Sequence, residues 1–332
     1  MLSQDDMRGL CGMLITPSLP GADKASFEGN NVNLVEAARV TEECIRARVG
    51  SLALCGTTGQ GHSVTWEEKV SFIDTVVQVN KNRIPIFAGS TTLGTRETAN
   101  QMKALRDIGA PGAFVGLALW QTPTIENASQ WYKDLGEAVP DMGIMVYANS
   151  NFFKTDFPQE LWEAIVAKKA RTVITCKMSS GHMSQNLESI LRACGKALFF
   201  MPGGGALTTY ETFQKTGTKW RGFWSTAVNA GPEPLVALAD ALEKGDLKRA
   251  EEVAADMATV PGHQPQGKRE QFRQMNVQAE QLRAKYSDFM DPGPLRPPYN
   301  DVPSDWLAAG MGAGRGWAEM RKKYIKAPAT AR

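Results

Sequence analysis

Short apolar runs alternate with longer stretches of helical periodicity over the first two-thirds of this 332-residue chain. This alternation is typical of repeated βα units built around a parallel sheet. We expect eight strands, at residues 11–16, 51–55, 84–88, 112–117, 143–147, 172–176, 197–201 and 220–224.

Eight such units can close into a barrel or form an open, doubly wound sheet. An open sheet more often carries a glycine-rich dinucleotide turn after its first strand. Here that strand is followed by Thr16-Pro17-Ser18-Leu19-Pro20, with no G-x-G-x-x-G pattern. The sequence therefore predicts an α/β fold of the (β/α)8 TIM barrel type, whose active sites lie at the carboxyl ends of the strands.

Two helix starts are predicted in the first half of the chain. Asn33 with Glu36 indicates a capped start, followed by a buried stripe at Leu34, Ala38, Thr41 and Ile45. The pattern Thr65-x-x-Glu68 is a capping box, in which the hydroxyl and the carboxylate each accept a hydrogen bond from a free backbone amide.

The alternation stops near residue 246, which predicts a catalytic barrel domain at 1–245 and a helical extension at 246–332 packed on it. Helices are expected near 246–259, 267–288 and 313–325, the second with a stripe of Met275, Ala279, Leu282 and Tyr286. The segment 291–300 is too rich in proline for a helix or a central strand.

Composition narrows the class of partner. A net charge of +2 with interspersed signs favours a small-molecule ligand over nucleic acid or an anionic membrane. The chain shows neither a run of about 20 apolar residues nor a signal peptide, so a cytoplasmic protein is expected. Three dispersed histidines and five scattered cysteines predict neither a metal site nor a disulfide framework.

Two of the predicted neighbouring strands end in reactive side chains, Tyr147 and Lys177. Parallel strands share one carboxyl edge, so the phenol and the amine are expected to meet there. A buried lysine loses its proton more readily and can attack a carbonyl to form an imine, and a phenol can relay protons. The alternatives are a surface lysine and a core tyrosine.

Two glycine-containing turns follow other strands. Gly56-Thr57-Thr58-Gly59 offers hydroxyls and amides to a carboxylate, or else only shapes a turn. Pro202-Gly203-Gly204-Gly205 stands where barrels often bind phosphate, but no basic residue is nearby in sequence, so close approach of the backbone to an oxo-acid is preferred. His62 is read as a solvated loop residue in preference to a substrate contact.

The Thr-Pro turn, Gly56-Thr57-Thr58-Gly59, Tyr147 and Lys177, in this order, resemble the lysine-dependent pyruvate aldolase superfamily of dihydrodipicolinate synthase and N-acetylneuraminate lyase. The resemblance covers about residues 8 to 245. It implies a Schiff base at Lys177 without metal or organic cofactor, Tyr147 as proton shuttle with Thr57 in its relay, and Thr58 and Gly59 near the carboxylate. It also implies a homotetramer.

Within that superfamily the chain is most similar to the trans-o-hydroxybenzylidenepyruvate hydratase-aldolases. The similar segments include Thr65-Trp66-Glu67-Glu68-Lys69, Phe223-Trp224-Ser225 and the tail at 296–300. This resemblance implies Trp224 as an aromatic wall of the pocket and Asn276 as a polar contact to a substrate hydroxyl or water.

The chain also departs from these patterns. No arginine follows Tyr147 in Ala148-Asn149-Ser150-Asn151, and Trp120 stands where dihydrodipicolinate synthases have a tyrosine. Gln60 replaces the usual glutamate after Gly59, and the hydratase-aldolases often have an aromatic residue in place of Thr58. These differences argue against lysine biosynthesis and leave the substrate open.

We therefore expect an enzyme that cleaves an aryl-substituted 2-oxobut-3-enoate with water to an aromatic aldehyde and pyruvate, in aromatic hydrocarbon breakdown. Trp120, Gly204, Trp224 and Asn276 are expected to contact this substrate. The alternatives are another pyruvate-dependent aldolase or synthase and a non-catalytic ligand-binding barrel.

Overall fold

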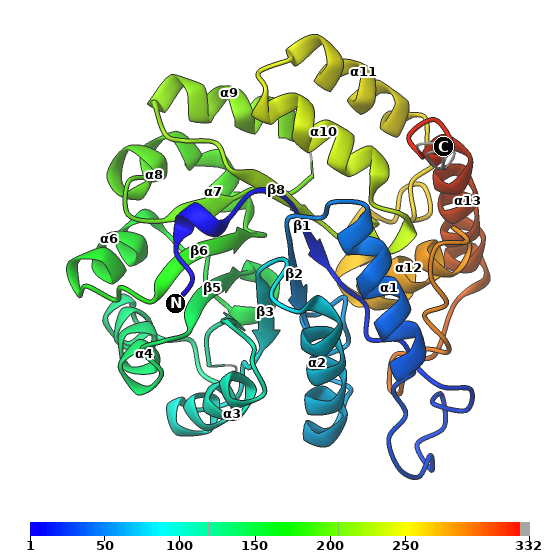
Figure 1. The fold of residues 1–332 in the computed structure, drawn as a ribbon, viewed down its shortest axis with the longest axis horizontal. Coiled ribbons are helices and arrows are strands. Elements are labelled where there is room, and N and C mark those ends of the chain that lie inside the picture. The colour runs from blue at the N-terminus through cyan, green and yellow to red at the C-terminus, as the bar shows by residue number, and fades with distance from the viewer. Residues whose placement is uncertain (119, 205, 326–332) are drawn as a thin grey trace, which may run out of the picture.

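Eight parallel strands form a barrel in this computed structural model, and helices surround the strands (Figure 1). The structure describes residues 1–118, 120–204 and 206–325. Neighbouring strands pair in the order β7-β6-β5-β4-β3-β2-β1-β8. An isolated parallel bridge between Gly203 and Trp224 joins β7 to β8 and nearly closes the ring. The predicted (β/α)8 TIM barrel is confirmed.

All eight expected strands are present, and their ends differ from the predicted ones by at most three residues. They are β1 (Gly9–Met13), β2 (Ser51–Leu54), β3 (Ile86–Gly89), β4 (Gly112–Val115), β5 (Gly143–Ala148), β6 (Val173–Met178), β7 (Phe199–Met201) and β8 (Gly222–Ser225). The first strand ends earlier than predicted because the amide of Ile15 donates to Oδ1 of Asn229 and not to a neighbouring strand. The apolar run continues, but the sheet pairing does not.

Helices follow the strands around the barrel and continue beyond it. They are α1 (Leu34–Arg46), α2 (Trp66–Asn80), α3 (Thr95–Asp107), α4 (Ile125–Ala138), α5 (Ser150–Phe153), α6 (Gln159–Ala167), α7 (Gly181–Gln185), α8 (Leu187–Cys194), α9 (Ala206–Thr216), α10 (Glu233–Glu243), α11 (Leu247–Ala258), α12 (Phe272–Lys285) and α13 (Ser304–Arg321). In the described residues no helix has both the length and the apolar character that crossing a membrane requires.

Both predicted helix starts are confirmed, but the predicted stripe on α1 is only partly right, with Thr41 buried and Leu34 partly buried against the core. Asn33 caps α1 through its side chain, and Thr65 with Glu68 forms the capping box of α2. Apart from Thr41, the buried apolar positions of α1 are Ala37, Val40 and Cys44, one residue away from the expected ones. The reason is that two apolar repeats overlap in this helix, and the sequence alone does not show which of them faces the barrel.

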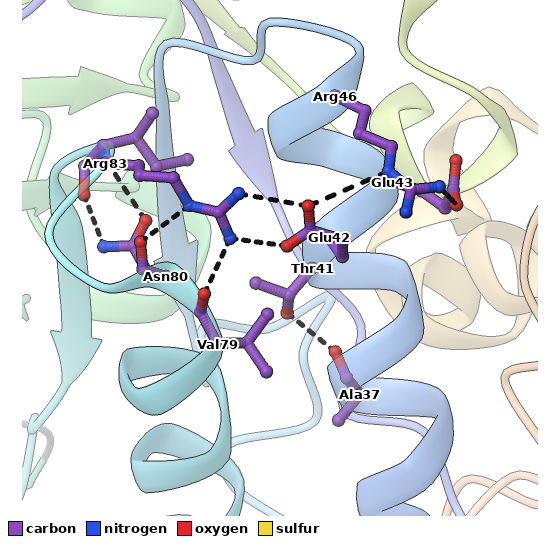
Figure 2. A network of polar contacts seen from close by, with 9 residues as sticks. Ala37, Thr41, Glu42, Glu43, Arg46, Val79, Asn80 and Arg83 are labelled. Carbon is purple, nitrogen blue, oxygen red and sulfur yellow. Dashed lines mark hydrogen bonds and ion pairs between the residues drawn. The ribbon is translucent and has the colours of Figure 1, made fainter.

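Helices α1 and α2 also contact each other through exposed polar groups at one end, as Figure 2 shows. Arg83, just after α2, donates from Nη1 to Oε1 of Glu42 at 3.0 Å and from Nη2 to the oxygen of Val79 at 2.7 Å. Ion pairs this exposed contribute at most about 1 kcal/mol. Stability at this contact therefore comes from the buried apolar faces.

The C-terminal helices differ most from expectation. Every residue of α12 from 277 to 284 is buried, so it is covered on all sides and not along one stripe. Helix α13 begins at Ser304, nine residues before the predicted start. Its glycines disfavour a helix when the sequence is read alone, so the first part of α13 was not predicted. In the structure they permit close packing on α12, because a Cβ on Gly310 would lie 2.4 Å from Cβ of Leu282.

Candidate active site

The reactive amine and the phenol lie side by side at the carboxyl ends of β5 and β6. Tyr147 is directly paired with Lys177 in the register of these two strands. The Lys177 Nζ lies 4.5 Å from the ring centroid of Tyr147 and 3.7 Å from that of Trp224 on β8. It donates a hydrogen bond of 2.8 Å to Oγ of Ser179. Two aromatic faces and one hydroxyl thus hold the amine in place.

Burial changes the proton affinity of this amine. Lys177 is 5% exposed, and the loss of water around the ammonium lowers its pKa from 10.5 to about 7, although the charge of Glu280 acts in the opposite direction. A lysine that is about half neutral near pH 7 is a nucleophile without further activation. The position has the property that imine formation requires.

Tyr147 is held by hydrogen bonds on both sides of its hydroxyl. Its oxygen lies 3.0 Å from Oγ1 of Thr57 and accepts from Nδ2 of Asn149 at 3.1 Å. The ring stacks on Phe114 at 4.6 Å and meets the edge of Phe153 at 5.3 Å. Burial raises the pKa of the phenol, with the two hydrogen bonds opposing, so it keeps its proton at neutral pH and can donate it.

The turn after β2 lies next to these groups. Thr57, Thr58 and Gly59 line a narrow void of about 10 Å³ together with Lys177 and Tyr147. Thr16 holds this turn by donating from Oγ1 to the oxygen of Gly59 at 2.6 Å. Within the described chain, the amides of Thr58 and Gly59 donate no hydrogen bond to protein, so they are free for an anion.

The wider space around the amine, which we call the lysine cavity, has a volume of about 200 Å³. Trp224 forms one wall and is oriented by a hydrogen bond of 2.9 Å from its Nε1 to the oxygen of Met178. Asn276 reaches this cavity from α12, so the C-terminal extension completes a site built on the barrel. Four of the predicted site residues, Lys177, Thr58, Trp224 and Asn276, therefore line one cavity.

A second, larger space of about 360 Å³, here called the aromatic cavity, adjoins the lysine cavity. The two share Tyr147, Phe152, Arg273 and Asn276 in their walls. Five aromatic rings line the aromatic cavity, those of Phe114, Tyr147, Phe152, Phe153 and Tyr299. A planar aryl group fits such a wall, and a polyhydroxylated chain would leave most of its hydroxyls without partners.

Two predicted site residues do not line the cavities. Trp120 is 81% exposed on the loop after β4 and contributes to none of these walls. Gly204 lies beside the Trp224–Ser225 backbone, where an added Cβ would come 3.7 Å from Oγ of Ser225. The last residue of the predicted glycine turn, Gly205, lies outside the described residues.

The departure at Gln60 has a structural role. Its side chain is buried and donates from Nε2 to Oε1 of Gln281 on α12 at 2.6 Å. The proline-rich tail adds a second connection, because Tyr299 lines the aromatic cavity and its ring meets that of His62 at 4.9 Å. His62 is exposed, as expected of a loop residue, and it also lines the aromatic cavity.

Sequence reasoning missed a buried carboxylate in the lysine cavity. Burial alone would raise the pKa of Glu280, but Arg283, followed by His263 and Thr226, outweighs it and holds the value at about 2. Thr226 donates to its Oε1 at 2.9 Å, and the Arg283 guanidinium donates to Oε2. A glutamate on a helix reads as a solvated position in sequence, so nothing pointed to this one.

A metal centre is not evident in the residues that the structure describes, since nowhere do three or more metal-binding side chains gather there. The polar groups around Lys177 are a phenol, hydroxyls, amides and the carboxylate of Glu280. This set suits proton transfer and covalent capture of a carbonyl.

The comparisons with known proteins agree with this geometry. The chain is 33% identical to a trans-O-hydroxybenzylidenepyruvate hydratase-aldolase of Pseudomonas putida over 98% of its own length and 97% of the relative. It is also 33% identical to a trans-2'-carboxybenzalpyruvate hydratase-aldolase of Nocardioides sp. strain KP7, with 96% of each covered.

A solved structure described as PhdJ bound to substrate intermediate superposes with a TM-score of 0.91 at 32% identity and covers 98% of this chain and 99% of that one. Residues 21–300 match the model of the dihydrodipicolinate synthetase family. The chain therefore belongs to the dihydrodipicolinate synthetase family.

Proposed function

We propose that this protein is a Schiff-base hydratase-aldolase that cleaves an aryl-substituted 2-oxobut-3-enoate with water to an aromatic aldehyde and pyruvate. The observation that carries the proposal is Lys177, a buried amine whose pKa of about 7 leaves it nucleophilic, beside the protonated phenol of Tyr147. The relatives named as hydratase-aldolases and the aromatic lining of the neighbouring cavity support the choice of substrate.

The reaction begins at the substrate ketone. The lone pair of Lys177 attacks carbon 2, the carbinolamine loses water, and a protonated imine forms. Tyr147 and Thr57, whose hydroxyl oxygens lie 3.0 Å apart, move the protons that this exchange requires. The ionised Glu280 in the same cavity stabilises the positive charge of the imine.

Water then adds to carbon 4, which is electrophilic because the alkene is conjugated with the imine. The electron pair moves to nitrogen as an enamine, and protonation of carbon 3 restores the imine. Asn276 orients this water, a role supported by its position in the walls of both cavities.

Cleavage of the carbon 3–carbon 4 bond follows. The new hydroxyl loses its proton and becomes the aldehyde, while the bonding electrons return to the imine and form the enamine of pyruvate. Protonation of carbon 3 and addition of water release pyruvate and regenerate the amine. The imine itself accepts the electrons, so the proposed chemistry needs no metal or organic cofactor.

A first test is covalent trapping. Borohydride reduction in the presence of pyruvate should add a single pyruvate-derived mass to the peptide that contains Lys177, and the Lys177→Arg variant should gain none. Unmodified wild-type protein would refute the enzymatic proposal and favour a ligand-binding barrel. A panel of benzylidenepyruvates, followed by loss of their conjugated absorbance, compared with sugar-derived oxo-acids, separates the proposal from other pyruvate aldolase reactions.

We also propose that the protein works as a homotetramer in the cytoplasm, where its five buried thiols would stay reduced. Leu93, Trp120 and Ile125 are 61%, 81% and 41% exposed, and large apolar side chains that reach solvent in this way favour association. Light scattering coupled to size exclusion gives the mass directly, and a monomeric mass would contradict the assembly.

A further inference from the structure

Two positive side chains line the aromatic cavity without a partner. Lys69 on α2 and Arg273 on α12 both belong to its wall. Among the residues described, neither side chain donates a hydrogen bond to protein or forms an ion pair. The cavity wall also contains no carboxylate within the described chain. Its charge is therefore unbalanced.

Lys69 is the more informative of the two. The residue is 8% exposed, which is rare for a lysine, and buried charges are normally paired. The neighbouring Glu68 does not neutralise it, because its carboxylate accepts from the backbone amides of Asn31 and Thr65. A buried ammonium with three free donors beside a cavity is suited to an anion that arrives with the ligand.

The position of Lys69 tells which part of a substrate it would reach. Lys177 lines the lysine cavity and the narrow void at Thr57–Gly59, but Lys69 lines neither of them. The carboxylate of an oxo-acid is one bond away from the carbon that joins Lys177, so it stays in those spaces. Only the distant, aryl end of the substrate extends into the aromatic cavity.

Building on the proposed function, we propose that Lys69, with Arg273 at the rim, forms an anion subsite that binds a carboxylate on the aryl ring of the substrate. A carboxylate offers two acceptor oxygens, and a charge-assisted hydrogen bond to a buried ammonium is stronger than one between neutral groups. The five rings of the wall hold the aryl group, and the two cations select its substituent. This makes Lys69 a specificity-determining residue.

The test compares benzylidenepyruvate with its 2-, 3- and 4-carboxy isomers. For wild-type protein, kcat/KM for the best carboxylated isomer should exceed that of the unsubstituted compound at least tenfold. In Lys69→Met, which keeps length and apolar volume, this preference should fall at least tenfold. Arg273→Gln, at an exposed position where folding is not at risk, should reduce it by a smaller factor.

Two matched controls change the same residue types elsewhere. Lys103→Met and Arg96→Gln replace exposed side chains outside the cavity walls and should retain the wild-type preference. Circular dichroism and the thermal midpoint show whether each variant is folded. If both cavity variants keep the preference within twofold, or if the wild type shows none, the subsite does not exist.

A binding measurement separates this outcome from a failure of the proposed function. The saturated analogues 4-(carboxyphenyl)-2-oxobutanoate and 4-phenyl-2-oxobutanoate cannot be hydrated or cleaved, and calorimetry gives their affinities without turnover. A preference for the carboxylated analogue that disappears in Lys69→Met supports the subsite even where no reaction occurs. Equal affinities in the wild type overturn it, whereas the proposed function fails only if pyruvate leaves no adduct on Lys177.

Discussion

The pH dependence of Lys177 is the most direct consequence of the structure. Burial lowers its pKa from 10.5 to about 7, a difference that corresponds to roughly 5 kcal/mol against the ammonium form. At pH 7.5 such an amine is roughly three-quarters neutral, whereas an ordinary lysine is neutral in about one molecule in a thousand. Burial therefore raises the concentration of the nucleophile by several hundredfold.

The sign of the effect follows from which form is reactive. Because the neutral amine attacks the carbonyl, reactivity should be constant above about pH 8 and fall tenfold per pH unit below about pH 6. Competitive labelling with a trace acylating reagent, followed by mass spectrometry of the Lys177 peptide, measures this midpoint without substrate. The exposed Lys103 in the same digest is the internal control for the efficiency of labelling.

The reasoning is refuted if the Lys177 midpoint lies above about 9, since the amine would then be solvated. It is also refuted if Lys177 resists labelling at every pH while pyruvate is still trapped elsewhere. A labelling midpoint near 7, with pyruvate trapping lost as the pH falls through the same value, would show that the buried amine is the group that forms the imine.

Other substitutions test the remaining parts of the site. Tyr147→Phe should lower kcat by about 10² to 10⁴, the usual range for losing a general acid–base group, and Tyr132→Phe, which removes a buried hydroxyl outside these cavities, should change kcat less than threefold. Glu280→Gln should move the labelling midpoint of the catalytic lysine below that of the wild type, because a negative charge that favours its ammonium is removed; an upward shift would contradict this. It should also destabilise the fold by about 3 to 5 kcal/mol in urea denaturation, because a buried guanidinium loses its partner. Gly61→Ala would place a Cβ 1.9 Å from a backbone oxygen and should lower the thermal midpoint, whereas Gly312→Ala on α13, with no atom within 4 Å, should leave it unchanged or raise it.

Local sequence patterns were sufficient where a structural element depends on its own residues. The eight apolar runs are the eight strands, and the Thr65–Glu68 pattern is the capping box of α2. The family match confirms the prediction of a carbon–carbon lyase of the class I aldolase kind. These features could be predicted because the alternation of strands and helices, the capping residues and the order of the reactive residues are all properties of the linear sequence.

Local sequence patterns failed to predict the helices whose structure depends on packing against another helix. The glycines of α13 argue against a helix when read alone, but they allow its backbone to approach α12, and this packing decides the outcome. Helix α12 likewise shows no single apolar stripe because it is covered on all sides. Neither the start of α13 nor the complete burial of residues 277–284 in α12 can be predicted without the contact between these two helices.

The sequence by itself determined the barrel and the presence of an amine and a phenol at one sheet edge, because the order of parallel strands follows from the repeated βα unit. Their direct pairing was not determined in this way, because the β5–β6 register shifts between Ile144 and Met145. Only the tertiary structure decided the pKa of Lys177, the ionised state of Glu280 and the unpaired charge of Lys69. Each of these depends on how much water and which partners surround a side chain. Those surroundings come from segments distant in sequence, such as α12 and the tail that carries Tyr299, which both line the aromatic cavity with Lys69.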